Sequence, residues 1–312
     1  MPVITERRAA AALLALALAA PLTVAAQAPA VDLSPEQPGR VRAQKVESAI
    51  RLLPKDYKWV TPGSFTVAIA GGRLPFAVYA TDTKTKVGSE PDLAQLVADS
   101  LGLKLELVNV AWADWPLGLQ SGRFDAVISN VTVTEARKEK FDFSTYRKDQ
   151  LGVYVKTDGP IKAIKEPKDL AGLKVIVQAS TNQEQILLRW NQQNVAAGLK
   201  PVEIQYYDDD VVQRLALQSG RADAYLGPNA IAAFEAARDG KTRLAGVFPG
   251  GWPLTAEIAV ATRKGAGLAD AITEALNAQI RSGSYARALA RWQLTSEAIE
   301  KSQTNPPGLP KS

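Results

Sequence analysis

Histidine and cysteine are both absent from the 312 residues of this sequence. Without histidine, a Ser-His-Asp or Cys-His catalytic arrangement is excluded, and so is a metal site held by imidazole. Without cysteine, thiol catalysis, thiolate-bound zinc and disulfide bonds are excluded as well. We therefore expect no metal site and no cofactor, and we look for a function in binding.

A dense run of one charge is also missing. The chain carries 37 lysines and arginines and 32 acids, a formal net charge of +5, and the basic residues are scattered. Because a nucleic-acid-binding surface concentrates its basic residues, we expect no nucleic-acid partner. Hydrophobic residues make up 46% of the chain, which is enough for one large or two modest domains.

Residues 1–28 have the pattern of a secretory signal peptide. Arg7 and Arg8 precede an apolar run of 12 residues, 9–20, and small residues follow at 24–28. Spanning a bilayer takes about 20 apolar residues, so a membrane anchor is the less favoured alternative. No cysteine follows that would carry a lipid. The segment therefore predicts an exported, periplasmic protein that is not a lipoprotein.

Strands and helices alternate after an N-terminal extension. The extension, residues 29–62, predicts one amphipathic helix at 41–53, ended by Pro54. The expected strands are 65–70, 103–110, 124–129, 173–178, 202–207 and 257–262. The expected helices are 91–101, 114–121, one from 182, one from 208, 268–282 and 285–294. Such alternation is typical of an α/β fold with mostly parallel sheets. Within the C-terminal tail, residues 295–312, the proline-rich segment 305–310 predicts no packed structure.

Three consecutive acids, Asp208, Asp209 and Asp210, raise the question of a metal site. They also stand where a helix is predicted to begin. Carboxylates in the first turn complement the dipole of a helix, and we favour this interpretation.

An eight-residue segment occurs twice, 98 residues apart. Residues 119–126 read LQSGRFDA and residues 217–224 read LQSGRADA, with seven identities. In both copies a helix is predicted to end at a glycine and a buried strand to begin. We infer two similar α/β lobes.

Polar side chains follow the predicted strands of both lobes. Ligands of open α/β sheets bind beyond the carboxyl ends of the strands. In the first lobe, residues 129–137 bring hydroxyls, an amide and Arg137 to a helix start, which suits a carboxylate. In the second lobe, residues 179–183 open another helix with small polar side chains. The aromatic candidates for contact with a ligand are Phe76, Trp112 and Trp115.

Several short motifs occur in an order that resembles one known family. They are Pro75-Phe76, Asp92-Leu-Ala, the first copy of the repeat, Thr132-Val-Thr-Glu-Ala-Arg137, Phe141-Asp-Phe-Ser144, the segment 169–175, Ala261-Thr-Arg-Lys-Gly265 and the segment 283–292. From about residue 65 to 292, the sequence is similar to the extracellular solute-binding proteins of polar amino-acid ABC transporters. The resemblance implies a periplasmic binding protein-like II fold, in which two lobes joined by a two-segment β hinge close around the ligand. It places lobe I at 63–150 plus 252–294 and lobe II at 151–248, with crossings near 150–156 and 246–253.

The resemblance also implies roles for individual residues. Arg137 matches the arginine that binds the ligand α-carboxylate, and Thr132 and Asn130 match neighbouring contacts. Trp115 matches an apolar wall of the side-chain pocket, and Arg73 falls where an aromatic ring often stacks. Ser180 and Asn182 match second-lobe residues that touch the carboxylate.

One position departs from the family pattern. An aspartate that holds the α-ammonium is usual after the strand that ends near 226, but this sequence has Gly227, Pro228 and Asn229. Another acid, such as Glu184 or Asp208, substitutes for it, or the ligand lacks a free α-ammonium. Arg73 points toward a second anionic group on the ligand.

The resemblance implies a monomeric, non-enzymatic transport component that binds a small carboxylate and docks on membrane permease subunits. Two alternatives stay open. The first is an exported enzyme that resembles cyclohexadienyl dehydratases, with Glu184 as its acid. The second is an accessory or sensory binding subunit.

Overall fold

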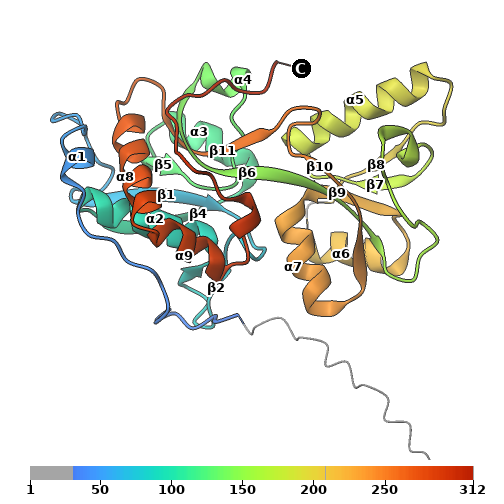
Figure 1. Ribbon diagram of the computed structural model, residues 1–312, viewed down its shortest axis with the longest axis horizontal. Coiled ribbons are helices and arrows are strands. Elements are labelled where there is room, and N and C mark those ends of the chain that lie inside the picture. The colour runs from blue at the N-terminus through green and yellow to red at the C-terminus, as the bar shows by residue number, and fades with distance from the viewer. Residues whose placement is uncertain (1–30, 208, 312) are drawn as a thin grey trace, which may run out of the picture. The chain divides into compact units, whose positions relative to one another are not determined.

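A computed structural model describes residues 31–207 and 209–311 (Figure 1). The predicted signal peptide, residues 1–28, and Asp208 lie outside the described residues. Within the described ranges, no helix is both long enough and apolar enough to cross a membrane.

Nine strands of the described residues form a continuous mixed sheet that runs through two lobes. Its order is β4-β1-β5-β11-β6-β9-β7-β8, and β10 also pairs with β6. The strands of lobe I are β1 (Ser64–Ala70), β4 (Lys104–Val110), β5 (Ala126–Val127) and β11 (Ala256–Arg263). The strands of lobe II are β7 (Lys174–Ile176), β8 (Glu203–Gln205), β9 (Ala224–Pro228) and β10 (Thr242–Pro249), and β6 (Phe141–Lys156) belongs to both lobes. Each lobe thus holds three parallel strands, as expected, next to antiparallel strands that join the lobes.

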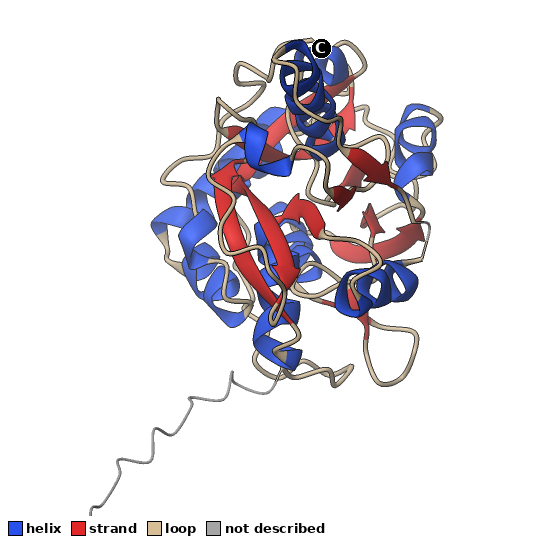
Figure 2. Cartoon of the chain, turned by 90° about the vertical axis from the view of Figure 1, so that its right-hand side faces the viewer, coloured by secondary structure: helices blue, strands red, loops and turns tan. Residues whose placement is uncertain are grey.

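Helices cover the sheet in both lobes (Figure 2). Lobe I has α2 (Ser89–Leu101), α3 (Trp115–Gln120), α4 (Glu135–Lys138), α8 (Ala269–Arg281) and α9 (Ser284–Arg291). Lobe II has α5 (Asn182–Ala196), α6 (Asp210–Ser219) and α7 (Asn229–Asp239). Short 3-10 turns lie at Trp112–Asp114, Pro167–Leu170 and Thr295–Glu297, and a small hairpin pairs β2 (Val78–Tyr79) with β3 (Lys86–Val87). The buried apolar side chains form two clusters in lobe II and two in lobe I, one of which also includes Ala230 of α7 from lobe II.

The repeated segment has the same place and the same role in each lobe. The glycine after each helix, Gly122 or Gly220, has a φ of +77° or +79°, a left-handed conformation that glycine adopts without strain. The aspartate of each copy fixes the neighbouring strand: Asp125 accepts a hydrogen bond from the backbone N–H of Thr66, and Asp223 accepts one from Lys174. The inference of two similar lobes is confirmed.

Two connections carry the chain between the lobes. The 16-residue strand β6 passes through both of them, and the chain returns through the segment between β10 and β11. These connections lie side by side, because Gln150 of β6 pairs with Pro249 of β10 and Asp149 pairs with Ala256 of β11. The two-segment β hinge therefore has the arrangement expected from the sequence.

Two expectations about the ends of the chain are wrong. In the extension, the helix covers only α1 (Glu47–Ile50) rather than 41–53, and the preceding residues run extended along lobe I. The proline-rich segment 305–310 is packed, since Leu309 is buried and forms a β-bridge to Thr134. The tail before it is packed too, with Glu297 and Ser302 buried and Thr304 bridged to Ser144 of β6. Proline prevents regular helix or sheet in such a segment, but it does not prevent burial against a sheet that is already formed.

Candidate functional site

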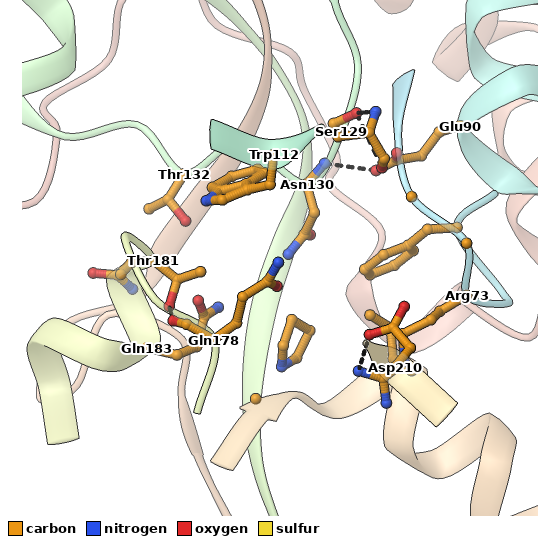
Figure 3. A pocket seen from close by; sticks show the side chains of 18 of the residues that line it. Arg73, Glu90, Trp112, Ser129, Asn130, Thr132, Gln178, Thr181, Gln183 and Asp210 are labelled. Carbon is orange, nitrogen blue, oxygen red and sulfur yellow. Dashed lines mark hydrogen bonds and ion pairs between the residues drawn. The ribbon is translucent and has the colours of Figure 1, made fainter. Parts of the chain in front are cut away.

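A cavity of about 410 Å³ lies between the lobes, at the carboxyl ends of the parallel strands (Figure 3). Lobe I contributes the residues that follow β1, β4 and β5, and lobe II contributes those that follow β7 and β9. Because α/β sheets bind ligands at this edge, the cavity is the candidate site. Its polar lining comes from strand ends, from the loops that follow them and from the starts of helices, and its position is fixed by the sheet.

Arg137 lines this cavity without an acidic partner among the described residues. It lies in α4, whose start is capped by the Thr134 hydroxyl, and its Nη1 donates to the Thr132 carbonyl at 2.9 Å. The guanidinium also lies 5.6 Å from the ring centre of Trp112. Burial lowers the pKa of Arg137 to about 10, so the group keeps its charge at neutral pH. A buried cation whose other side-chain N–H groups have no hydrogen-bond partner within the described ranges suits an anionic ligand.

The start of α5 faces the same cavity from lobe II. The Thr181 hydroxyl accepts a hydrogen bond from the backbone N–H of Glu184 and caps this 15-residue helix. Thr181, Asn182 and Gln183 line the cavity. The first N–H groups of a helix have no partner within the helix, and its dipole favours negative charge there. Both lobes therefore offer groups to one anion.

Glu90 is a buried acid on the cavity wall. Its Oε1 accepts hydrogen bonds from the Asn130 N–H at 2.6 Å and from the Tyr146 hydroxyl at 3.0 Å. Its Oε2 is buried and has no hydrogen-bond partner within the described residues. Burial raises the pKa of Glu90 to about 7, although the nearby positive charge of Arg147 acts in the opposite direction.

This raised pKa predicts a pH dependence of stability. Between about 4.5 and 7 the folded state holds a proton on Glu90 that the unfolded state releases. The stability that this proton contributes is therefore complete below the unfolded pKa and is lost as the pH rises through 7. From pH 5 to pH 8, we expect the free energy of unfolding of Glu90→Gln to rise by about 2 kcal/mol relative to the unsubstituted chain.

Urea denaturation of both proteins at the two pH values measures this difference. The matched control is Glu36→Gln, because Glu36 is an exposed glutamate of the extension. If the difference in stability between Glu90→Gln and the unsubstituted chain is the same at both pH values, the pKa of Glu90 is not raised.

Six of the nine residues singled out from the sequence line the cavity: Arg73, Phe76, Asn130, Thr132, Arg137 and Asn182. Three do not. Trp115 is 2% exposed and packs against Phe141 in the core of lobe I, so Trp112, three residues earlier, lines the cavity instead. The spacing of the two tryptophans does not distinguish them, because the chain turns through a 3-10 segment between them.

Ser180 and Asn229 are the other two that lie outside the cavity lining. Ser180 lines a neighbouring cavity of about 490 Å³, and its carbonyl accepts the indole N–H of Trp112 at 3.3 Å. Asn229 begins α7 and turns away, so that its Oδ1 accepts the Tyr154 hydroxyl at 2.9 Å. The end of β9 therefore brings Gly227 and Pro228, and no carboxylate, to the cavity.

Arg73 is already engaged by acids of the chain itself. It forms ion pairs with Glu235 at 3.0 Å and with Asp210 at 3.6 Å, both from lobe II. The expectation that Arg73 points toward a second anionic group of the ligand stays a prediction, which these ion pairs disfavour. Sequence reasoning missed its partners, since they lie more than 130 residues away in the chain.

Ser129, Thr181 and Gln183 also line the cavity, and they lie in the two segments that the rule of strand ends selected. Asp210, which the sequence analysis assigned to the start of a helix, is a further lining residue. The lining residues that the sequence analysis missed include Glu90, Gln178 and Tyr225. Glu90 had no signal of a binding role, because an acid before a helix is most simply a first-turn charge.

The cluster of acids at 208–210 has a structural role at its second position. The Asp209 carboxylate accepts the backbone N–H of Val212 at 2.8 Å and caps α6. Among the residues that the structure describes, no group of three acids is placed to hold a metal ion. Glu184, the acid nominated for a catalytic role, accepts the Ser180 N–H at 2.7 Å and does not line the 410 Å³ cavity.

This chain is similar in sequence and in fold to proteins that bind amino acids. The L-cystine-binding protein TcyJ of Escherichia coli (strain K12) is 37% identical over 165 residues, which span 53% of this chain and 58% of that protein. A solved structure of an ancestral arginine-binding protein bound to arginine has a TM-score of 0.64 and 30% identity over 74% of this chain and 98% of that one. An ancestral amino acid-binding protein, described as a precursor of cyclohexadienyl dehydratase, has a TM-score of 0.62 and 28% identity over 74% and 95% of the two chains.

A family model matches residues 65–295, which include both lobes, both connections and every residue that lines the cavity. The matched range begins at β1 and ends at the last 3-10 turn, so the extension and most of the tail are additions to the shared fold. The chain belongs to the bacterial extracellular solute-binding proteins, family 3.

Proposed function

We propose that this chain is the periplasmic substrate-binding component of an ABC transporter and that it captures an amino acid, or a closely related small carboxylate, between its lobes. The observation that carries the proposal is the guanidinium of Arg137, which faces the cavity without an acidic partner among the described residues. A buried cation without a counter-charge is costly to fold, and a ligand carboxylate repays that cost. The family membership supports the same conclusion.

The carboxylate of the ligand bridges the two lobes. On lobe I it meets Arg137 and the hydroxyl of Thr132, and on lobe II it meets the start of α5 at Thr181 and Asn182. A ligand that contacts both lobes binds the closed form more tightly than the open form and so shifts the population toward closure. Capture requires no chemical step.

Glu90 is the acid best placed to receive a positive group of the ligand. Among the described residues that line the cavity, the acids are Glu90 and Asp210, and Asp210 faces Arg73. In this proposal the carboxyl group of Glu90, whose Oε2 has no hydrogen-bond partner within the described residues, takes the part that the missing acid after β9 would play. An α-ammonium near this oxygen would favour the charged form of Glu90.

A thermal-shift screen of the twenty common amino acids and L-cystine tests the proposal. A ligand at 100 times its dissociation constant adds about 2.7 kcal/mol to the free energy of unfolding. The matched control for each ligand that stabilises the protein is its decarboxylated analogue, for example cystamine for L-cystine. We expect stabilisation by the acid and none by the analogue. Equal shifts for both compounds, or no shift with any amino acid, would contradict the proposal.

The proposal includes the absence of turnover, a periplasmic location and permease partners. Prephenate and arogenate are expected to be recovered unchanged after incubation with the protein. In cell fractionation, the protein is expected in the periplasmic fraction with a mass that corresponds to cleavage near residue 28.

The ligand-loaded protein is expected to be recovered together with the membrane permease subunits. It is not expected to associate with itself, since the proposal is of a monomeric transport component.

A further inference from the structure

The end of the cavity opposite Arg137 holds a cluster of opposite charges. In Figure 3, Arg73 and Asp210 lie together, away from Thr132 and Trp112, which are the neighbours of Arg137. A ligand whose carboxylate meets Arg137 therefore extends its side chain toward Arg73.

Arg73 is bound there from three sides, always by lobe II. Its Nε and Nη2 donate to the two carboxylate oxygens of Glu235 at 3.2 and 3.0 Å, a bidentate pair. Its Nη1 lies 3.6 Å from Asp210 and 3.5 Å from the hydroxyl of Tyr225, and its Cζ lies 5.3 Å from the ring centre of Tyr225. Two carboxylates and an aromatic face are the groups that recognise a guanidinium.

The side chain of Arg73 also separates two spaces. It lines the 410 Å³ cavity on one side and a cavity of about 20 Å³ on the other. Glu235 lines only the smaller one, behind the guanidinium. Removal of the Arg73 side chain would join the two spaces and leave Glu235 and Asp210 at the end of a longer cavity.

We propose that Arg73 occupies a cation subsite of the ligand cavity as a built-in substitute for a cationic ligand side chain, so that the protein selects amino acids with uncharged or acidic side chains and rejects arginine and lysine. This inference rests on the proposed function. A ligand guanidinium would compete with Arg73 for the same carboxylates and would be repelled by it. The preference against arginine and lysine then arises because the guanidinium of Arg73 already occupies the place that their charged side chains would take.

Isothermal titration of the purified chain with L-arginine, L-lysine and L-glutamine tests the inference. The unsubstituted chain should bind L-glutamine, whose side chain is uncharged, at least tenfold more tightly than L-arginine or L-lysine. In Arg73→Ala, the affinity for L-arginine should rise at least tenfold, and adding Glu235→Gln should remove this gain. The matched control is Arg214→Ala, because Arg214 also lies 3.7 Å from Glu235 but does not line the larger cavity. It should show no gain.

A second measurement tests the subsite without an amino acid. Methylguanidinium should raise the melting temperature of Arg73→Ala in a saturable way and leave that of the unsubstituted chain unchanged. Tight binding of L-arginine by the unsubstituted chain would overturn the inference. So would an Arg73→Ala variant that responds to neither L-arginine nor methylguanidinium. If methylguanidinium stabilises the variant but no amino acid binds either protein, the subsite stands and the proposed function fails.

Discussion

Replacement of Arg137 by alanine is expected to weaken ligand binding at least a hundredfold. Truncating one partner of a buried, hydrogen-bonded charge pair costs about 2–5 kcal/mol of binding free energy, and every 1.4 kcal/mol is a tenfold change. The unliganded protein should keep its melting temperature, because the variant removes a buried charge that has no acidic partner among the described residues. Titration calorimetry and thermal shift measure the two effects separately.

Two further variants make this result specific. Arg137→Lys keeps the charge but loses the planar fork of donors, so it should recover only part of the affinity. Arg123→Ala removes an exposed arginine from lobe I and should leave the dissociation constant unchanged. An Arg137→Ala variant that binds with full affinity would place the carboxylate elsewhere in the cavity.

Local sequence patterns predicted the lobes because each pattern reports on neighbouring residues. A strand such as 104–110 alternates along its own length, and the repeated glycine and aspartate act on the adjacent turn and strand. Five of the six confirmed lining residues also follow from local patterns, since they stand after strands or at the start of helices, whereas Arg73 was singled out through the family resemblance. Their roles as ligand contacts remain predictions.

Local sequence patterns do not predict the partners of Arg73, Glu90 and Arg147, because these partners are distant in the sequence. Arg73 meets Glu235, which is 162 positions away, and Glu90 meets Tyr146, which is 56 positions away. A single sequence carries no signal that links such positions, because each residue alone is compatible with an exposed surface. The error at Trp115 has a different origin, because Trp115 begins α3 and is buried in the core, whereas Trp112 lies in the 3-10 turn before it.

The packing of the tail could not be predicted from local sequence patterns either. From this packing we expect a large loss of stability when Glu297 is replaced. Glu297 is 2% exposed and forms an ion pair with Arg147 of β6, which is 1% exposed. Glu297→Ala leaves the guanidinium of Arg147 buried with a weaker set of partners. Breaking a buried pair from one side costs about 3–5 kcal/mol, so we expect a fall of about 3 kcal/mol in the free energy of unfolding. Urea denaturation measures it.

A double variant separates the ion pair from simple packing. Glu300→Ala, the matched control, removes an exposed glutamate three positions further along the tail and should change stability little. Arg147→Met combined with Glu297→Leu replaces the pair with apolar side chains, and it should be more stable than Glu297→Ala, because no buried charge is left alone. The single variants Arg147→Met and Glu297→Leu complete the comparison. If the double variant loses as much stability as the two single variants together, the packing of the tail stabilises it and the ion pair does not. The packed tail would then stabilise lobe I through its apolar contacts with β6, and the ion pair of Arg147 with Glu297 would add little.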